Sequence, residues 1–195
     1  MIPDPALRIR LTTLFVEGWD LWDRFDMEVR DRGWHPFINA DYEAVLHTLL
    51  ELHAPGARFL EWGSATGIIT IAADMLGFKA YGIELDPKLV EVARGLARRH
   101  ASRAHFVAGS FIPPGYRWSP DDGDARMGTI GEGESAYQEL GHSLDAFDVV
   151  YAYPWPAEEA MMLDLMSRHG KPGATLLLFG TAGAVRAFRD GAPAL

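Results

Sequence analysis

The sequence contains no cysteine among its 195 residues. A chain without cysteine forms no disulfide and no thiolate metal site, which excludes disulfide-stapled secreted scaffolds and zinc–cysteine modules. No apolar run approaches the roughly 20 residues needed to span a bilayer, and the first residues lack the basic start and apolar stretch of a signal peptide. We therefore expect a cytoplasmic protein without a membrane anchor.

Positive charge is scarce, because 18 basic residues face 27 acidic ones and the net charge is −9. Such a balance repels phosphate backbones, so no nucleic-acid partner is expected. In the one basic cluster, Arg94 and Arg98 are four residues apart on a predicted helix, a spacing that favours a solvated face over a binding patch. The cluster consists of Arg94, Arg98, Arg99 and Arg103.

The length suits a single domain, 1–195, with a buried core, since 48% of the residues are hydrophobic. Apolar residues at helical spacing predict helices over residues 5–31 and 41–53, with Gly18 leaving open a division of the first. We expect residues 1–55 to form a helical cap on a core of residues 56–195.

From residue 57 onward, predicted strands alternate with predicted helices. The strands are expected at 58–62, 80–84, 104–108, 148–153 and 174–179, and the main helices at 66–76, 87–100, 135–144 and 156–169. This alternation indicates an α/β fold with a parallel sheet covered on both faces. Residues 113–133 form a long acidic loop, which is either a passive insertion or a lid facing the substrate.

The sharpest motif is the stretch from Phe59 to Gly67, where a strand enters a tight turn at Gly63 and continues into a helix. Glu84 ends the next strand, where an acid reaches the two hydroxyls of a ribose. The dinucleotide fingerprint G-x-G-x-x-G fails, because Ala65 and Ile68 stand at its second and third glycines. A nicotinamide oxidoreductase is therefore the least favoured interpretation.

The segment from Glu61 to Gly67 resembles the first motif of the class I S-adenosylmethionine-dependent methyltransferases, an acid and one residue followed by G-x-G-x-G, with alanine at the middle glycine. The resemblance continues through Glu84 and residues 107–111, 147–155 and 171–175, and spans residues 40–180. It implies a three-layer Rossmann-like fold with a mostly parallel sheet of five or six strands. It further implies S-adenosyl-L-methionine as cofactor and in-line methyl transfer to a small molecule or a protein side chain.

The resemblance also implies site residues. Those placed against the cofactor are Glu61, Gly63, Ser64, Ala65, Gly67, Glu84, Leu85, Ser110 and Phe111. Those placed beside the substrate, at the end of the fourth strand, are Tyr153, Pro154 and Trp155, for which core packing stays an equal alternative. No residue is assigned as a general base, and no metal site is expected, because the seven histidines are scattered.

Three departures from the family pattern bear on function. Ala65 replaces a glycine, and Ser110 stands where the family often has an acid near the adenine. Ala152 and Tyr153 fail the first two positions of the motif that nucleic-acid amino methyltransferases carry after strand four. The first two departures keep open a non-catalytic relative that serves as an interaction module, and the third removes the best support for base methylation.

Two short segments bear on the substrate class. The loop at Pro36 and Phe37 and the segment from Glu84 to Val90 are similar to the lysine methyltransferases of the ATP synthase c subunit.

Only 15 residues, Thr181 to Leu195, follow Gly180. They have room for one more strand, at about residues 184–189, but not for the helix and strand pair that usually follow strand five. We expect a trimmed sheet whose edge is covered by that strand or by a partner subunit in a homo-oligomer. Specificity should then come from the N-terminal helices and the acidic loop.

Overall fold

A computed structural model of the chain describes residues 4–30, 40–52, 56–117, 133–155, 158–180 and 183–194. The helices are α1 (Pro5–Arg30), α2 (Tyr42–Leu52), α3 (Ile68–Met75), α4 (Pro87–Arg99), α5 (Tyr137–Leu140) and α6 (Glu159–His169), with a short 3-10 helix at Leu144–Ala146. The strands are β1 (Arg58–Trp62), β2 (Lys79–Glu84), β3 (His105–Ala108), β4 (Val149–Ala152), β5 (Thr175–Phe179), β6 (Val185–Arg189) and β7 (Ala192–Pro193).

One sheet holds the described strands in the order β3-β2-β1-β4-β5-β6-β7. The first five of these are parallel to one another, while β6 runs antiparallel to β5 and β7 antiparallel to β6. The α/β fold with a mostly parallel sheet is thus confirmed. The expected count of five or six strands is wrong, because a two-residue strand also fits behind β6. As expected, a late strand covers β5, and it pairs with that strand along its whole length.

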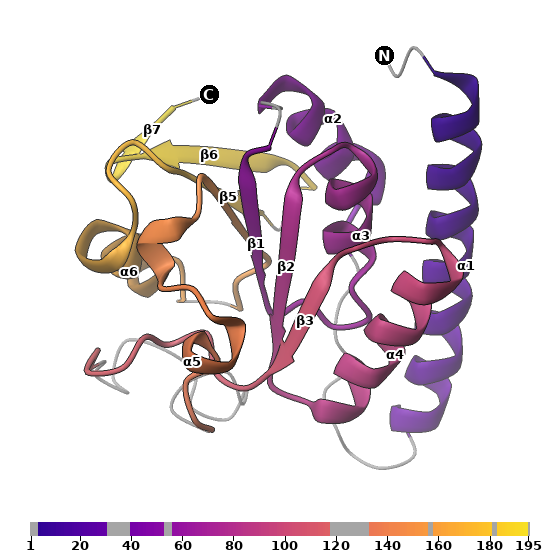
Figure 1. The fold of residues 1–195 in the computed structure, drawn as a ribbon, viewed down its shortest axis with the longest axis horizontal. Coiled ribbons are helices and arrows are strands. Elements are labelled where there is room, and N and C mark those ends of the chain that lie inside the picture. The colour runs from indigo at the N-terminus through magenta and orange to yellow at the C-terminus, as the bar shows by residue number, and fades with distance from the viewer. Residues whose placement is uncertain are drawn as a thin grey trace.

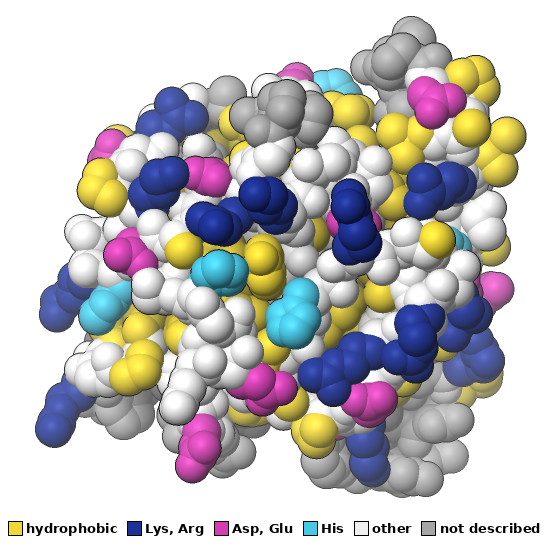
Figure 2. Space-filling view, viewed as in Figure 1, with side chains coloured by type: hydrophobic (Ala, Val, Ile, Leu, Met, Phe, Trp, Pro, Cys, Tyr) yellow, Lys and Arg dark blue, Asp and Glu magenta, His cyan; other side chains and the backbone are white. Residues whose placement is uncertain are grey.

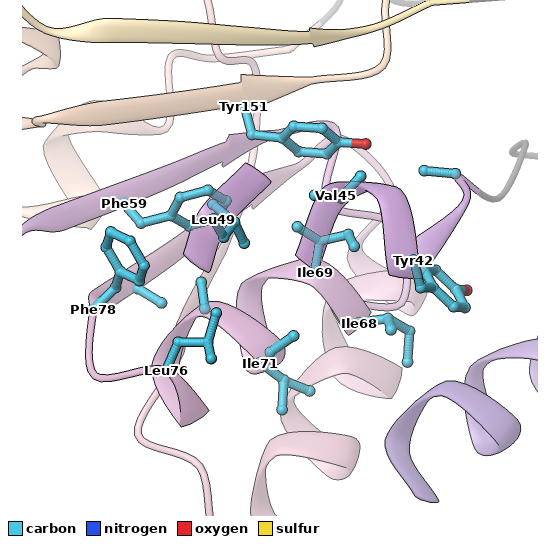
Figure 3. Packing of buried hydrophobic residues seen from close by; sticks show 14 of the residues in the cluster. Tyr42, Val45, Leu49, Phe59, Ile68, Ile69, Ile71, Leu76, Phe78 and Tyr151 are labelled. Atoms are coloured by element: carbon cyan, nitrogen blue, oxygen red, sulfur yellow. The ribbon is translucent and has the colours of Figure 1, made fainter. Parts of the chain in front are cut away.

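Helices cover the two faces of the sheet unequally (Figure 1). The long α1 lies with α2, α3 and α4 on one face, and the shorter α5 and α6 lie on the other. Side chains alternate between the faces along each strand. In β1, Phe59 therefore packs toward α2 and α3, whereas Leu60 and Trp62 pack toward α5 and α6. Figure 3 shows the first of these cores, where Leu49, Ile69 and Tyr151 meet from different elements.

Two predicted helices differ from the structure. Helix α1 runs unbroken through Gly18. The glycine allows close packing against α3, since a Cβ there would lie 2.9 Å from Cγ1 of Ile68. The helix expected over 135–144 is shorter, since Gly141 takes a left-handed φ of 72° and ends α5. The helix expected from 156 is described from Glu159 onward.

Some residues named in the sequence analysis lie in segments that the structure does not describe. Pro36, Phe37 and residues 118–132 of the acidic loop lie outside the described residues. Within the described ranges, every helix is too short or too polar to cross a membrane. The same ranges bring together no group of three His, Cys, Asp or Glu side chains that could hold a metal ion.

The basic cluster is partly used in internal contacts. Figure 2 shows Lys and Arg side chains gathered over the region of α4. Arg94 donates to the backbone oxygen of Phe106 at 2.8 Å, and Arg99 donates through its Nε to Glu17 at 2.9 Å. The Arg94 contact occupies an acceptor on the edge strand β3, which protects that edge from pairing with another chain.

Candidate functional site

The turn between β1 and α3 is built on left-handed backbone. Gly63, Ala65 and Gly67 have φ values of +69°, +45° and +79°. A positive φ is natural for glycine but strained for alanine, whose Cβ crowds the backbone. Alanine can therefore stand at the middle position of the motif only because the surroundings hold it there.

Glu84, at the carboxyl end of β2, is what holds Ala65. Its Oε2 accepts a hydrogen bond from the Ala65 backbone N–H at 2.8 Å, and its Oε1 accepts from the Asp86 N–H at 3.0 Å. Burial raises the pKa of Glu84, and these backbone hydrogen bonds oppose the rise. The two oxygens of a carboxylate accept about four hydrogen bonds, so Glu84 keeps acceptor capacity for a ligand. Glu84 thus fixes the turn and remains able to bind at the same edge of the sheet.

The two glycines of the turn serve different purposes. A Cβ on Gly67 would lie 2.6 Å from the Phe106 ring and 2.9 Å from the Ala93 Cβ, so the turn packs there against β3 and α4. A Cβ on Gly63 would meet nothing within 4 Å. The backbone at Gly63 therefore borders open space, where a ligand can come close to it.

Glu61 lies below the turn with only 6% of its surface exposed. Its Oε2 accepts hydrogen bonds from the backbone N–H of Thr70, at 2.9 Å, and from the Thr70 hydroxyl. Burial raises the pKa of Glu61 to about 8, and the charge of Glu84 contributes in the same direction. Thr70 was not singled out from the sequence, although its place one turn into α3 is typical of a residue that faces the preceding strand.

A pocket opens above Glu61 at the carboxyl edge of the sheet. Its walls are the turn, the start of α3, the start of α2 and the end of β4. The lining residues are Ala40, Tyr42, Glu61, Gly63, Ser64, Ala65, Thr66, Ile68, Ile69, Tyr151 and Tyr153.

Five of the predicted site residues thus share this pocket: Glu61, Gly63, Ser64, Ala65 and Tyr153. The sequence interpretation missed Tyr42 and Tyr151. Strand alternation could have found Tyr151, since it pairs with Glu61 in the β1–β4 register and so shares its face.

Ser64 contributes mainly through its backbone. Its N–H donates to the Ile83 oxygen at 2.9 Å, and its side chain lies against Gly82, where a Cβ would come within 2.8 Å of the hydroxyl. Ser64 is buried, and its hydroxyl has no hydrogen-bond partner among the described residues. The residue therefore fastens the turn to β2.

Three further residues predicted against the cofactor, Leu85, Ser110 and Phe111, do not line this pocket. The Ser110 hydroxyl accepts from the Ile112 N–H at 3.1 Å, and the Ser110 N–H donates to the Glu134 oxygen at 2.8 Å. Phe111 is buried and stacks on Trp62 with ring centroids 5.1 Å apart. Leu85 lies against Gly133, where a Cβ would come within 2.8 Å of its Cδ1.

The predicted substrate residues divide at the end of β4. Tyr153 lines the pocket while its ring packs edge-on against Phe179, at 4.9 Å between centroids. The Trp155 N–H donates to the Glu158 carboxylate at 2.9 Å, and Pro154, which precedes Trp155, is half-buried. Core packing is thus evident for Tyr153, and its pocket position leaves a substrate contact available.

Comparison with known proteins finds no matching family model. Two curated relatives, both named ribosomal protein L11 methyltransferase, come from Thermus thermophilus and Ralstonia nicotianae. Each is 30% identical to this chain, over 95 residues (47% of the chain) and 133 residues (67%) respectively. This chain covers 37% and 35% of their lengths, so it spans about a third of the curated relatives that it matches.

Among solved structures, a methyltransferase from Thiobacillus denitrificans with S-adenosyl-L-homocysteine has a TM-score of 0.49 and 20% identity. That match covers 74% of this chain and 50% of the other. An RNA methyltransferase from Salinibacter ruber, with the same ligand, has a TM-score of 0.47 and 21% identity, and the coverage is 69% and 72%. The sequence matches confirm the resemblance to methyltransferases that the turn and Glu84 carry.

Proposed function

Because the chain resembles the class I S-adenosylmethionine-dependent methyltransferases in sequence and in fold, we propose that it binds S-adenosyl-L-methionine and methylates a protein side chain. The single observation that carries this proposal is the turn of Gly63, Ala65 and Gly67, fixed by the Glu84 carboxylate at the carboxyl edge of a parallel sheet. Ligands of open α/β sheets bind at this edge, beside the point where the strand order reverses. Here the reversal lies between β1 and β4.

The residues present fit this cofactor. Open space borders the backbone of Gly63, as a closely approaching ligand requires, and Glu84 has lone pairs to accept from ribose hydroxyls. Glu61 would face the ammonium group of the methionine portion through the carboxylate oxygen that Thr70 does not occupy. When bound, the cofactor supplies a methyl group on a sulfonium, which needs no metal and no covalent enzyme intermediate.

The chain's own contribution to transfer would be alignment. In-line displacement is accelerated chiefly by holding the nucleophile, the methyl group and the leaving sulfur in one geometry. Tyr153 lines the pocket at the end of β4 and could orient an amine there. If that amine belongs to a lysine, with an ordinary pKa of about 10.4, it must lose a proton before it attacks.

The names of the curated relatives favour a protein acceptor over a small molecule. The similarity of the segment from Glu84 to Val90 to lysine methyltransferases points to the same class. We also propose that the N-terminal helical segment, residues 1–55, caps the core and shapes specificity. This is supported by Ala40 and Tyr42, which line the pocket from the start of α2.

Calorimetric titration of the full chain with S-adenosylmethionine, S-adenosylhomocysteine and NAD tests the cofactor. We expect both sulfur compounds to bind and NAD not to bind. In Glu84→Ala, loss of a charge-assisted hydrogen bond should weaken their binding about tenfold or more. The matched control is Glu159→Ala, which removes a half-buried acid, paired with Arg186, from α6 on the other face of the sheet. Binding of NAD alone would overturn the proposal.

A labelled-methyl assay on cell extract tests the acceptor. Label should enter the protein fraction, and ribosomal proteins are the first to separate and examine. Label in the nucleic-acid or small-molecule fraction would contradict the proposed protein substrate, but it would still support the proposed cofactor.

A non-catalytic binding module is the second candidate, and one observation favours it. The Ser110 hydroxyl, which stands where the family often has an acid, already accepts a backbone hydrogen bond within the fold. A module of this kind would bind S-adenosylhomocysteine without moving label into any fraction.

A further inference from the structure

The buried hydroxyl of Tyr151 stands without a hydrogen-bond partner among the described residues. Tyr151 is only 2% exposed. A buried polar group without a partner destabilises the folded state. Tyr137, another buried tyrosine, shows the usual arrangement, because its hydroxyl accepts from Trp62 Nε1 at 3.0 Å. No described residue satisfies the Tyr151 hydroxyl, so it is available to a ligand in the pocket that it lines.

The position of Tyr151 shows where that partner would lie. Tyr151 is paired with Glu61 in the β1–β4 register, so the two side chains leave the sheet on the same face. Both line the pocket. In Figure 3 the Tyr151 oxygen points away from Phe59 and toward the side where Val45 and Tyr42 of α2 lie. The hydroxyl thus lies at the base of the pocket, between β4 and the start of α2.

The two groups at this base have opposite hydrogen-bonding capacities. A nearby cation favours the ionised form of Glu61, and the carboxylate oxygen that Thr70 does not occupy then accepts. Burial raises the pKa of Tyr151 well above its usual range, and the charge of Glu61 adds to the rise. The phenol consequently stays protonated and can donate. An acceptor beside a donor is the complement of a group that carries an ammonium and a carboxylate on one carbon.

We propose that the Tyr151 hydroxyl donates a hydrogen bond to the carboxylate of the ligand's amino-acid end, while Glu61 faces its ammonium group. This inference rests on the proposed function and deepens it, since it names a residue that recognises the amino-acid end of the ligand. A plain nucleoside lacks that end. Tyr151 would be a specificity residue for an α-amino-acid group, in addition to the turn that receives the rest of the ligand.

The test compares two ligands that differ only in this group. S-adenosylhomocysteine carries the ammonium and the carboxylate, whereas 5′-methylthioadenosine has the nucleoside and the sulfur without them. Calorimetric affinities are measured for the wild-type chain, for Tyr151→Phe and for Tyr137→Phe. The last is the matched control, because it removes a buried tyrosine hydroxyl from the opposite face of the sheet.

We expect Tyr151→Phe to lower the affinity for S-adenosylhomocysteine about tenfold and to leave the affinity for 5′-methylthioadenosine unchanged. Tyr137→Phe should change neither affinity. Equal weakening of both ligands, or of neither, in Tyr151→Phe would overturn the inference and spare the proposed function, provided that the wild type binds. A wild-type chain that binds neither ligand would overturn both. Thermal unfolding of the three chains without ligand shows that each is folded.

Discussion

The two faces of the sheet differ in how they treat a buried tyrosine hydroxyl. On the face covered by α5 and α6, the indole N–H of Trp62 donates to the Tyr137 hydroxyl at 3.0 Å. On the face covered by α1 to α4, Glu61 is buried with a raised pKa and Tyr151 has no partner among the described side chains. Figure 1 shows that one set of strands carries helices on both of its faces.

The difference distinguishes buried groups that stabilise the fold from buried groups that are available to a ligand. A satisfied buried pair fixes a unique packing, whereas a buried acid and an orphan hydroxyl destabilise the free protein and gain their partners from a ligand. Strained and unsatisfied groups are found together at functional sites for this reason. The strained Ala65 lies on the turn above Glu61. The predictions below test whether the two faces differ in this way.

The largest expected effect is that of Gly67→Ala. The added Cβ would meet the Phe106 ring at 2.6 Å on a backbone with φ of +79°, so strain and overpacking combine. We expect the free energy of unfolding to fall by about 2–5 kcal/mol in urea denaturation. Gly63→Ala is the control, since its Cβ meets nothing within 4 Å, and it should lose only about 1–2 kcal/mol of backbone strain. Equal losses would show that packing at Gly67 does not matter.

Glu61→Gln should change how stability depends on pH. The folded protein holds the Glu61 proton up to about pH 8, whereas the unfolded chain releases it near 4.5. The stabilising contribution of this proton is complete below pH 4.5 and is lost as the pH rises to 8, by at most about 1.4 kcal/mol per pH unit. Urea denaturation of both chains from pH 5 to 8 measures the difference. Parallel curves would mean that Glu61 is already ionised in the folded state.

The two buried tyrosines should respond differently to loss of the hydroxyl. Tyr137→Phe leaves the indole N–H of Trp62 buried without its acceptor, which should cost about 1–3 kcal/mol in the free energy of unfolding. Tyr151→Phe removes a hydroxyl that has no partner in the described structure, so the ligand-free protein should be unchanged or slightly more stable. A comparable loss in Tyr151→Phe would reveal a structural partner for its hydroxyl.

Most of the fold was predictable from the sequence because the β–α units carry strong local signals. Asp86 before Pro87 predicts the start of α4, and the structure shows Asp86 accepting from the Lys88 N–H at 2.8 Å. Gly18 misled the helix prediction, since its role is packing against another helix and only tertiary structure reveals that. The small β7 was missed, because a two-residue strand has no periodicity to detect.

The candidate site was predictable where one motif holds its residues together. Glu61, Gly63 and Ala65 meet at the pocket because they follow one another through a single turn. Tyr42 and Tyr151 could not be placed by a local motif, since they come from α2 and β4 and meet only when the sheet is assembled. The side chain of Phe111 packs on Trp62, which depends on the order of strands rather than on its own segment.

The smallest expected effect concerns how α1 is held on the face that carries Glu61 and Tyr151. Glu17 of α1 accepts from Arg99 Nε at 2.9 Å and contacts His100 Nε2 at 2.7 Å, both at the end of α4. Burial acts to raise the pKa of Glu17, but the hydrogen bonds with His100 and Arg99 outweigh it and leave the pKa lowered. Its contribution is therefore present above the ordinary pKa of the carboxyl and is lost as the pH falls below it.

Glu17→Gln should reduce the free energy of unfolding at pH 7 by about 0.5–1 kcal/mol, within the range of partly exposed ion pairs. The control is Glu91→Gln, which breaks a pair with Arg94 inside α4 and joins no two helices. If α1 is fastened through Glu17, the wild type and Glu17→Gln should converge in urea denaturation as the pH approaches 3, while Glu91→Gln stays close to the wild type at pH 7. Equal losses in the two variants at pH 7 would mean that the contact between α1 and α4 adds nothing beyond a surface pair, and that apolar packing alone holds α1 on this face.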